Sequence, residues 1–273
     1  MDRNQGRSHV RSVRLLASAG AVALAMAAAG CATTPSAPDV TGSIATDAAP
    51  RSEAEWRREM NVWGQRYRAD QADSVAAIRY AQALRAIGQR AQATAVLEQA
   101  TISNPHDQPL LGAYGRALAD NGNFDQALEV LNRAHSPDRP DWRILSVQGA
   151  VLDQLGRHAE AQRYYASALR LVPDEPSVLS NLGLSHALSK NLPQAEIALR
   201  RAAQQKPADP KIRQNLALVI GLQGRFAEAE KIVRADLSPD EAAQNVAYLR
   251  RMMAQQNDLK KLSRPGGALA PSS

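Results

Sequence analysis

The side chains that could perform covalent or metal chemistry are few in this chain of 273 residues. The single cysteine, Cys31, excludes an intramolecular disulfide and a cysteine-based zinc site, because both need several thiols. No two histidines have the H-E-x-x-H spacing of a zinc protease, and the sequence contains neither a P-loop nor a G-x-S-x-G motif. We therefore expect a non-catalytic protein with no metal site, no cofactor and no small-molecule substrate.

Residues 1–30 have the composition of an export signal. Four arginines precede an uncharged run at 15–29, which is shorter than the roughly 20 residues that span a bilayer. A basic start, a short apolar middle and a small-residue exit are typical of a secretory signal peptide. The exit, Ala28-Ala29-Gly30-Cys31, resembles the lipobox of bacterial lipoproteins. This resemblance implies cleavage before Cys31 and lipidation of Cys31; an ordinary signal with an incidental cysteine and an uncleaved anchor are the alternatives.

The residue after Cys31 and the charge of the remaining chain bear on location and partners. Residue 32 is Ala rather than Asp, which by the sorting of bacterial lipoproteins implies the periplasmic face of the outer membrane. Several acyl chains anchor a protein stably to a membrane, whereas one chain is marginal. Without residues 1–30 the chain loses four arginines and one aspartate, so its formal net charge falls from +6 to +3. This charge does not support a nucleic-acid partner, and we predict none.

Two segments of the chain lack any hydrophobic period. Residues 31–50 are rich in Ala, Thr, Pro and Ser, and the chain ends in SRPGGALAPSS. Such segments cannot bury enough apolar surface to offset the entropy lost on ordering. We therefore expect a disordered tether at 31–50 and a disordered tail at 257–273.

The region between these segments repeats every 34 residues. One position of the repeat holds glycine in four of the five repeats, at Gly88, Gly122, Gly156 and Gly224. In the remaining repeat it holds Lys190. Two further columns hold only small residues: Ala93, Ala127, Ala161, Ala195 and Ala229, and Ala81, Gly115, Gly149, Gly183 and Ala217. The period is typical of two helices joined by a tight turn, whose glycine supplies the positive φ that ends the first helix. Lys190 would make the fourth turn either costlier or different in shape.

The composition favours helices over strands. Alanine is the commonest residue, while aromatic residues make up only 4% of the chain. The small columns mark close approaches of helix backbones, and larger residues are expected to fill the core: Leu84, Leu118, Leu152, Ile220, Leu97, Leu131, Tyr165, Leu199 and Val233. His186 shares a column with Leu84 and is expected in the core, whereas His158 lies in a turn and is expected in solvent.

This pattern resembles the tetratricopeptide repeat, most closely at Asn181-Leu182-Gly183 and in the segment GRHAEA at 156–161. The resemblance implies an all-α fold, a right-handed α-solenoid of helix-turn-helix repeats with capping helices at both ends. Five repeats are expected over 74–237. A capping half-repeat is expected before them at 51–73, and a capping helix after them at 238–256, because Ser238-Pro239 is a strong helix start.

The register of the tetratricopeptide family implies a concave groove that is lined by the first helix of each repeat and binds a protein segment. The implied groove positions are Arg79, Gln82, Arg85, Arg116, Arg143, Ser146, Asn181, Leu184, Leu188, Gln214, Asn215, Leu218 and Leu222. The N-terminal half of this set is basic and the C-terminal half adds leucines, which would suit a partner with an acidic part and an apolar part. The alternative is that the arginines are solvated and the leucines belong to the core between repeats.

A more specific resemblance adds to the lipobox the segments GAVLDQLGRHAEAQRYYASAL, RQNLALVIGLQGRFAEAE and NVAYLRRM. Over about 52–256 the chain is similar to TadD-type lipoproteins of the tight-adherence (Flp) pilus machinery. This resemblance implies a pilotin-like scaffold that binds the secretin or other pilus-assembly subunits of a type IV pilus and type II-like secretion assembly. The alternative is an outer-membrane lipoprotein that organises or activates cell-wall enzymes.

Overall fold

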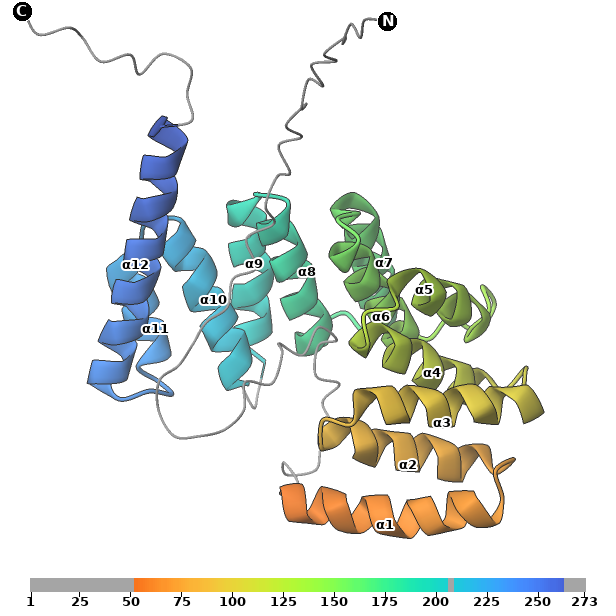
Figure 1. Ribbon diagram of the computed structural model, residues 1–273. Helices are drawn as coiled ribbons and strands as arrows, with labels where there is room; N and C mark the ends of the chain where they lie inside the picture. The colour runs from red at the N-terminus through yellow and green to blue at the C-terminus, as the bar shows by residue number, and fades with distance from the viewer. Residues whose placement is uncertain (1–51, 206–208, 263–273) are drawn as a thin grey trace, which may run out of the picture. The chain divides into compact units, whose positions relative to one another are not determined.

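The described part of the chain is entirely helical. The computed structural model describes residues 52–205 and 209–262, and within them the chain forms twelve α-helices and no strand (Figure 1). The predicted all-α solenoid of helix-turn-helix units is confirmed. The predicted signal peptide at 1–30, the lipidation site Cys31, the tether at 31–50 and the tail beyond residue 262 lie outside the described residues.

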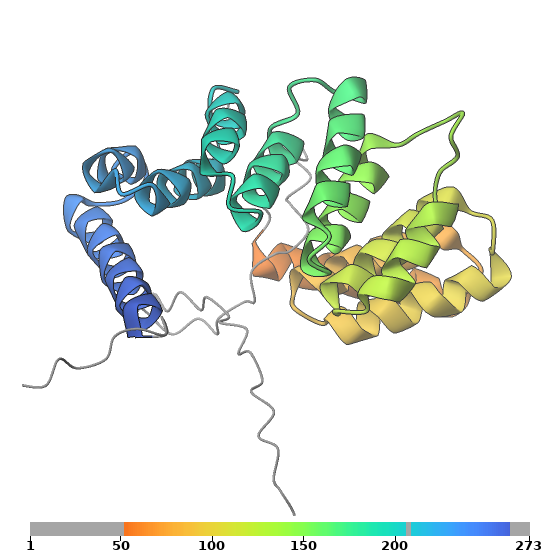
Figure 2. The ribbon, with the colours of Figure 1, turned by 90° about the horizontal axis from the view of Figure 1, so that it is seen from above.

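Ten of the helices pair into five repeats. The first helices are α2 (Ser74–Ala86), α4 (Gln108–Asp120), α6 (Trp142–Gln154), α8 (Pro176–Leu188) and α10 (Pro210–Leu222). The second helices are α3 (Arg90–Ser103), α5 (Phe124–Arg133), α7 (His158–Leu171), α9 (Leu192–Ala203) and α11 (Phe226–Val233). After the short α5, the loop at 134–141 reaches away from the helices, as Figure 2 shows in yellow-green.

One further helix lies at each end of the five repeats. The first, α1 (Glu53–Ala69), packs on α2. It begins with a capping box in which the Glu55 N–H donates to Ser52 Oγ at 3.3 Å and the Ser52 N–H donates to Glu55 Oε2 at 2.6 Å. This reciprocal pair satisfies two N–H groups that the helix itself leaves without partners.

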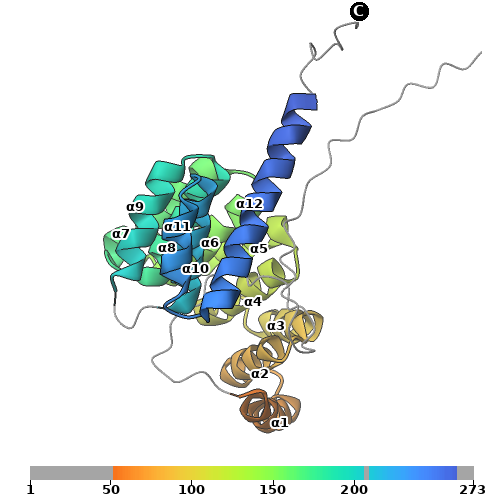
Figure 3. The same cartoon turned by 90° about the vertical axis from the view of Figure 1, so that its left-hand side faces the viewer.

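The last helix, α12 (Pro239–Leu262), packs on α10 and α11 and reaches past both of them (Figure 1, Figure 3). It also starts with a capping box, in which the Ser238 N–H donates to Glu241 Oε2 at 3.0 Å. The helix extends beyond the end predicted at residue 256, because no glycine or proline interrupts the sequence before Pro265.

An acidic side chain caps the start of every first helix. Asp73 accepts a hydrogen bond from the N–H of Ala76 at 3.0 Å, and this bond lowers the pKa of Asp73. The same role recurs every 34 residues at Asp107, Asp141, Glu175 and Asp209. A negative charge at a helix N-terminus satisfies a free N–H and is favoured by the helix dipole. The 34-residue spacing of these capping residues is visible in the sequence.

Each repeat turns at a residue with positive φ. The repeating glycines have φ of 73° to 83°: Gly88, Gly122, Gly156 and Gly224. Lys190 has φ 66° and is the only non-glycine residue with positive φ in the described chain. Its turn keeps the usual form, since the Asn191 N–H donates to the His186 carbonyl at 2.8 Å, just as Arg157 donates to Leu152 at 2.8 Å. The fourth turn therefore keeps the shape of the others. Its left-handed conformation costs about 1–2 kcal/mol more with lysine than with glycine.

Within a repeat, the two helices meet where a small residue faces a large one. A Cβ atom at Gly183 would lie 2.6 Å from Cγ of Leu199 and 3.1 Å from the carbonyl oxygen of Ala195. A Cβ at Gly149 would lie 2.6 Å from Cε1 of Tyr165. The backbones are thus too close for a methyl group. The predicted core residues are all buried around these contacts: Leu84, Leu118, Leu152, Ile220, Leu97, Leu131, Tyr165, Leu199 and Val233.

The first helices of neighbouring repeats lie close to one another. Backbone contacts join α2 to α4, α4 to α6, α6 to α8 and α8 to α10, whereas no second helix in the described chain contacts another second helix in this way. Each second helix packs instead on the first helix before it and on the helix that follows it, which for α11 is the capping helix α12. This asymmetry places the first helices on the inner side of the stack, and we call their exposed side the inner surface.

Gly183→Ala is expected to destabilise the protein by about 1–3 kcal/mol, because the added methyl overpacks a contact that includes a backbone carbonyl. Urea unfolding followed by circular dichroism measures this change. Trimming Leu199→Ala in the same chain should offset part of the loss, so that the double variant loses less than the sum of the two single variants. Additive losses would show that the methyl does not collide with Leu199.

Lys190→Gly is expected to raise the free energy of unfolding by about 0.5–1 kcal/mol, because glycine adopts positive φ without a Cβ clash while gaining some freedom in the unfolded chain. The same unfolding measurement tests it. Lys190→Ala is the matched control, since alanine keeps the Cβ and should leave stability close to that of the wild type. A glycine variant no more stable than the alanine variant would contradict the argument from strain.

Candidate functional site

All thirteen residues predicted to contact a partner lie on first helices, but their exposure differs along the stack. They are Arg79, Gln82 and Arg85 on α2, Arg116 on α4, Arg143 and Ser146 on α6, Asn181, Leu184 and Leu188 on α8, and Gln214, Asn215, Leu218 and Leu222 on α10. Gln82 and Gln214 are exposed. The others fall into three groups, which are the arginines of the first three repeats, the hydroxyl and amide side chains of the last three repeats, and the leucines of the last two repeats.

The arginines are partly engaged within the fold. Arg85 forms an ion pair with Asp120 that links α2 to α4. The guanidinium of Arg143 lies 4.5 Å from the ring centroid of Trp142, which is a cation–π contact. Arg79 is exposed on α2. Arg85 therefore contributes less free positive charge to the inner surface than the sequence predicts, whereas Arg79 and Arg143 remain exposed.

The hydroxyl and amide side chains tie neighbouring first helices together. The amide nitrogen Nδ2 of Asn181 donates to Ser146 Oγ at 3.3 Å, and that of Asn215 donates to Ser180 Oγ at 3.2 Å. The two pairs are 34 residues apart, so the same link joins α6 to α8 and α8 to α10. Both serines are buried. Ser146 therefore serves the packing of the repeats, although the sequence predicts it as a partner contact.

Four leucines lie on the first helices of the last two repeats, and Leu188 is the most exposed of them. Leu188 is 55% exposed, and Leu184, Leu218 and Leu222 are partly exposed. None of the four takes part in the hydrophobic clusters that make up the core of the described chain. Leu188 is therefore not a core residue, whereas the other three leucines are partly buried. We call Leu184, Leu188, Leu218 and Leu222 the leucine patch.

A buried carboxylate at the end of α6 binds three side chains. Asp153, whose side chain is 7% exposed, accepts from Ser185 Oγ at 2.8 Å and from the Tyr165 hydroxyl at 3.1 Å. Its Oδ1 also lies 2.8 Å from Nδ1 of His158. Because these partners come from α7 and α8, Asp153 joins the third repeat to the fourth. Burial, together with this carboxylate, raises the pKa of Tyr165 well above its ordinary value.

The two histidines near Asp153 differ from the predictions made for them. His158, expected in solvent, is only 25% exposed because Asp153 holds it against the turn. His186 is partly buried, and its buried Nδ1 has no hydrogen-bond partner. Burial lowers the pKa of His186, while the charge of Asp153 raises it in part. Ser185 is fully buried and donates to the carboxylate instead of to a histidine, so these residues do not form a nucleophile and base pair.

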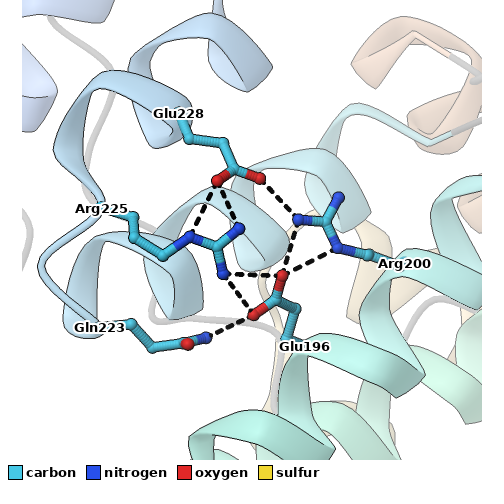
Figure 4. A network of polar contacts seen from close by, with 5 residues as sticks. All are labelled: Glu196, Arg200, Gln223, Arg225 and Glu228. Atoms are coloured by element: carbon cyan, nitrogen blue, oxygen red, sulfur yellow. Dashed lines mark hydrogen bonds and ion pairs between the residues drawn. The ribbon is translucent and has the colours of Figure 1, made fainter.

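A network of five side chains joins α9 to α11 and the turn before it (Figure 4). Glu196 accepts from Gln223 Nε2 at 2.8 Å, from Arg200 Nη2 at 2.6 Å and from Arg225 Nη1 at 2.7 Å. Glu228 also binds both arginines. Burial alone would raise the pKa of Glu196, but these hydrogen bonds outweigh it and lower the pKa to about 2. The network therefore links the last two repeats, and sequence analysis does not identify it because its members lie up to 32 residues apart.

Neither a candidate metal cluster nor a candidate membrane-spanning helix is found among the described residues. The described residues contain no group of three or more His, Cys, Asp or Glu side chains that could hold a metal ion. None of the helices in the described ranges is both long enough and apolar enough to cross a membrane.

Family comparison now defines the class of repeat. Residues 84–150 and residues 147–210 each match a family model for the tetratricopeptide repeat. These matches identify the helix pairs over 84–210 as tetratricopeptide repeats, and the helix pairs on either side of them have the same form. No curated protein sequence matches the chain.

Individual solved structures share this fold. PilW, described as a widely conserved type IV pilus biogenesis factor, has a TM-score of 0.63 at 16% identity, over 71% of this chain and 91% of PilW. TTC0263, a tetratricopeptide-repeat protein of Thermus thermophilus, has a TM-score of 0.56 at 23% identity, over 64% and 98%. PilF of Pseudomonas aeruginosa has a TM-score of 0.54 at 19% identity, over 72% and 94%. At these identities the likeness establishes the fold alone.

Glu196→Gln is expected to destabilise the protein by about 1–2 kcal/mol at pH 7, because two arginines lose a charged acceptor while solvent screens part of the effect. The folded pKa of about 2 lies below the ordinary value of 4.5. The stability that Glu196 contributes is therefore complete above about pH 4.5 and is lost as the pH falls toward 2. Urea unfolding at about pH 7 and about pH 3 should show the difference between wild type and variant shrinking at the lower pH.

Glu160→Gln is the matched control for this measurement. Glu160 pairs with Arg157, three residues away on the exposed start of α7, so its replacement should change stability very little at either pH. A Glu196 variant that behaves like the Glu160 variant at neutral pH would contradict a stabilising role for the network.

Proposed function

We propose that this chain is a lipid-anchored scaffold on the periplasmic face of the outer membrane that binds protein subunits of a tight-adherence (Flp) pilus assembly. The lipid on Cys31 would hold the protein at the membrane, and the tether at 31–50 would let the repeats search for a partner. The inner surface would bind that partner. The role is pilotin-like, in that a small lipoprotein helps a secretin or another assembly subunit to localise, assemble or remain stable.

The observation that carries the binding role is the leucine patch. Leu188 is more than half exposed, three partly exposed leucines share its face of the stack, and clustered apolar side chains at a surface mark interaction sites. The exposed Arg79 on α2 adds a charged part at the other end of the inner surface. These features support a protein partner.

The pilus assignment is supported by resemblance. The segments quoted above are similar to TadD-type lipoproteins. Two solved proteins share this fold: PilW, which is described as a type IV pilus biogenesis factor, and PilF of Pseudomonas aeruginosa. Both superpose on most of this chain. The sequence around Cys31 supports the lipid anchor.

Crosslinking in cells that produce a C-terminally tagged chain tests this proposal. We expect the secretin or other pilus-assembly subunits to co-purify with the wild-type protein. Their recovery should be strongly reduced with Cys31→Ser, because the unlipidated protein is no longer held at the outer membrane. Incorporation of a clickable palmitate analogue should be lost in the same variant. Recovery of cell-wall enzymes in place of pilus subunits would contradict the pilus assignment.

Charge reversal tests the other end of the inner surface. The double variant Arg79→Glu with Arg116→Glu is expected to recover less of the same partner, because it replaces positive charge on α2 and α4 with negative charge. Arg133→Glu, on the second helix α5, is the control and should recover the partner as the wild type does. Unchanged recovery by the double variant would show that the partner does not contact α2 and α4.

A further inference from the structure

We propose that the leucine patch and Lys190 together form the docking site for an amphipathic helix of the partner, with the apolar side of that helix on the leucines and a carboxylate on Lys190. This inference rests on the proposed function, because it specifies which part of the inner surface binds and what it binds. It assigns a binding role to Lys190, a residue outside the predicted groove positions.

The leucine patch has the dimensions of a helix-binding face. Leu184 and Leu188 are four residues apart on α8, and Leu218 and Leu222 are four residues apart on α10. At about 1.5 Å per residue, each pair spans about 6 Å along its helix, and packed helices lie roughly 8–10 Å apart. A partner helix presents apolar side chains at positions i, i+4 and i+7 with the same spacing.

The patch is confined to the last two repeats. In the first three repeats, the positions equivalent to Leu184 and Leu218 hold Gln82, Arg116 and Ala150, and those equivalent to Leu188 and Leu222 hold Ala86, Asp120 and Gln154. The fold is the same in all five repeats, so it does not require leucine at these positions. Packing within a repeat therefore does not explain the leucine at position 188, which is 55% exposed.

Lys190 provides a second, independent observation at the edge of the patch. It lies two residues after Leu188, is exposed, and forms no ion pair with a described residue. It also adopts φ 66° where the other four repeats have glycine. A strained side chain at a position where glycine would cost less points to a use for that side chain. An ammonium group beside an apolar patch suits a ligand that carries a carboxylate next to its apolar side, because the two charges would pair.

The acidic groups of this chain near the patch are already bound to other side chains and do not pair with Lys190. Asp153 is buried and already bound by Ser185, Tyr165 and His158. Glu196 is held by two arginines and Gln223. The neighbouring exposed side chain in the turn, Ser189, is uncharged. Lys190 thus gives this edge of the patch a positive character that complements an acidic partner.

Site-specific photocrosslinking identifies the occupant. We would place benzoylphenylalanine at position 188 of the full-length protein in cells that assemble the pilus, and sequence the crosslinked peptide by mass spectrometry. The expected peptide belongs to a pilus-assembly subunit, has apolar residues spaced three to four apart, and carries Asp or Glu beside them. The matched control is position 197, because Ile197 on α9 is 59% exposed and lies off the inner surface; it should not yield this peptide.

A synthetic copy of the crosslinked peptide then gives affinities by fluorescence anisotropy. Leu188→Ser should weaken binding at least about tenfold, as expected for a central apolar contact, whereas Ile197→Ser should leave it unchanged. Lys190→Gly should raise stability but weaken binding about threefold or more, and it should reduce the salt dependence of binding. Opposite signs for stability and affinity in one variant separate a binding role from a structural one.

The outcomes distinguish this inference from the proposed function. If the wild type captures pilus subunits but position 188 gives no crosslink, or gives a peptide without helical apolar spacing, the docking site is wrong and the scaffold role stands. A crosslink to a second copy of this chain would likewise overturn the inference, in favour of self-association. If the wild type captures no pilus subunit, the proposed function fails and the inference fails with it.

Discussion

The close approach of the two helices within each repeat is the constraint on which the rest of this structure depends. At Gly149 and Gly183 the opposing Tyr165 and Leu199 leave no room for a methyl group. That contact fixes how the helices of a repeat cross, and the positive-φ turn after the first helix sets where the second one starts. Because the same contact recurs every 34 residues, each repeat presents the same faces to its neighbours.

The links between repeats are made by other residues, and they differ from one junction to the next. Arg85 and Asp120 join the first repeat to the second, and Asp153 joins the third to the fourth through Ser185. The Glu196 network joins the last two repeats. In a repeat protein such nearest-neighbour links decide how stability is distributed along the stack. Polar groups buried at these junctions also fix the register of one repeat on the next, since an unpaired partner would be costly.

The inner surface follows from the same geometry. First helices contact first helices, so their outward residues form a continuous face whose chemistry the fold does not dictate. Charged and amide groups occupy its N-terminal part, and leucines occupy its C-terminal part. Lys190 lies at the edge of the leucines in a conformation that the turn imposes on any residue placed there. Function in this protein is therefore carried by positions that the repeat leaves free.

The sequence by itself determined the repeat, the helices and the buried columns, because a 34-residue period records local packing and turn geometry that each repeat must satisfy. It also located the first-helix positions, since they share that period. Only the tertiary structure decided that Ser146 ties two helices together, that His158 is held by Asp153, and that Leu188 remains more than half exposed. These outcomes depend on which side chains meet across a junction, and residues distant in the sequence meet there only after the stack has formed.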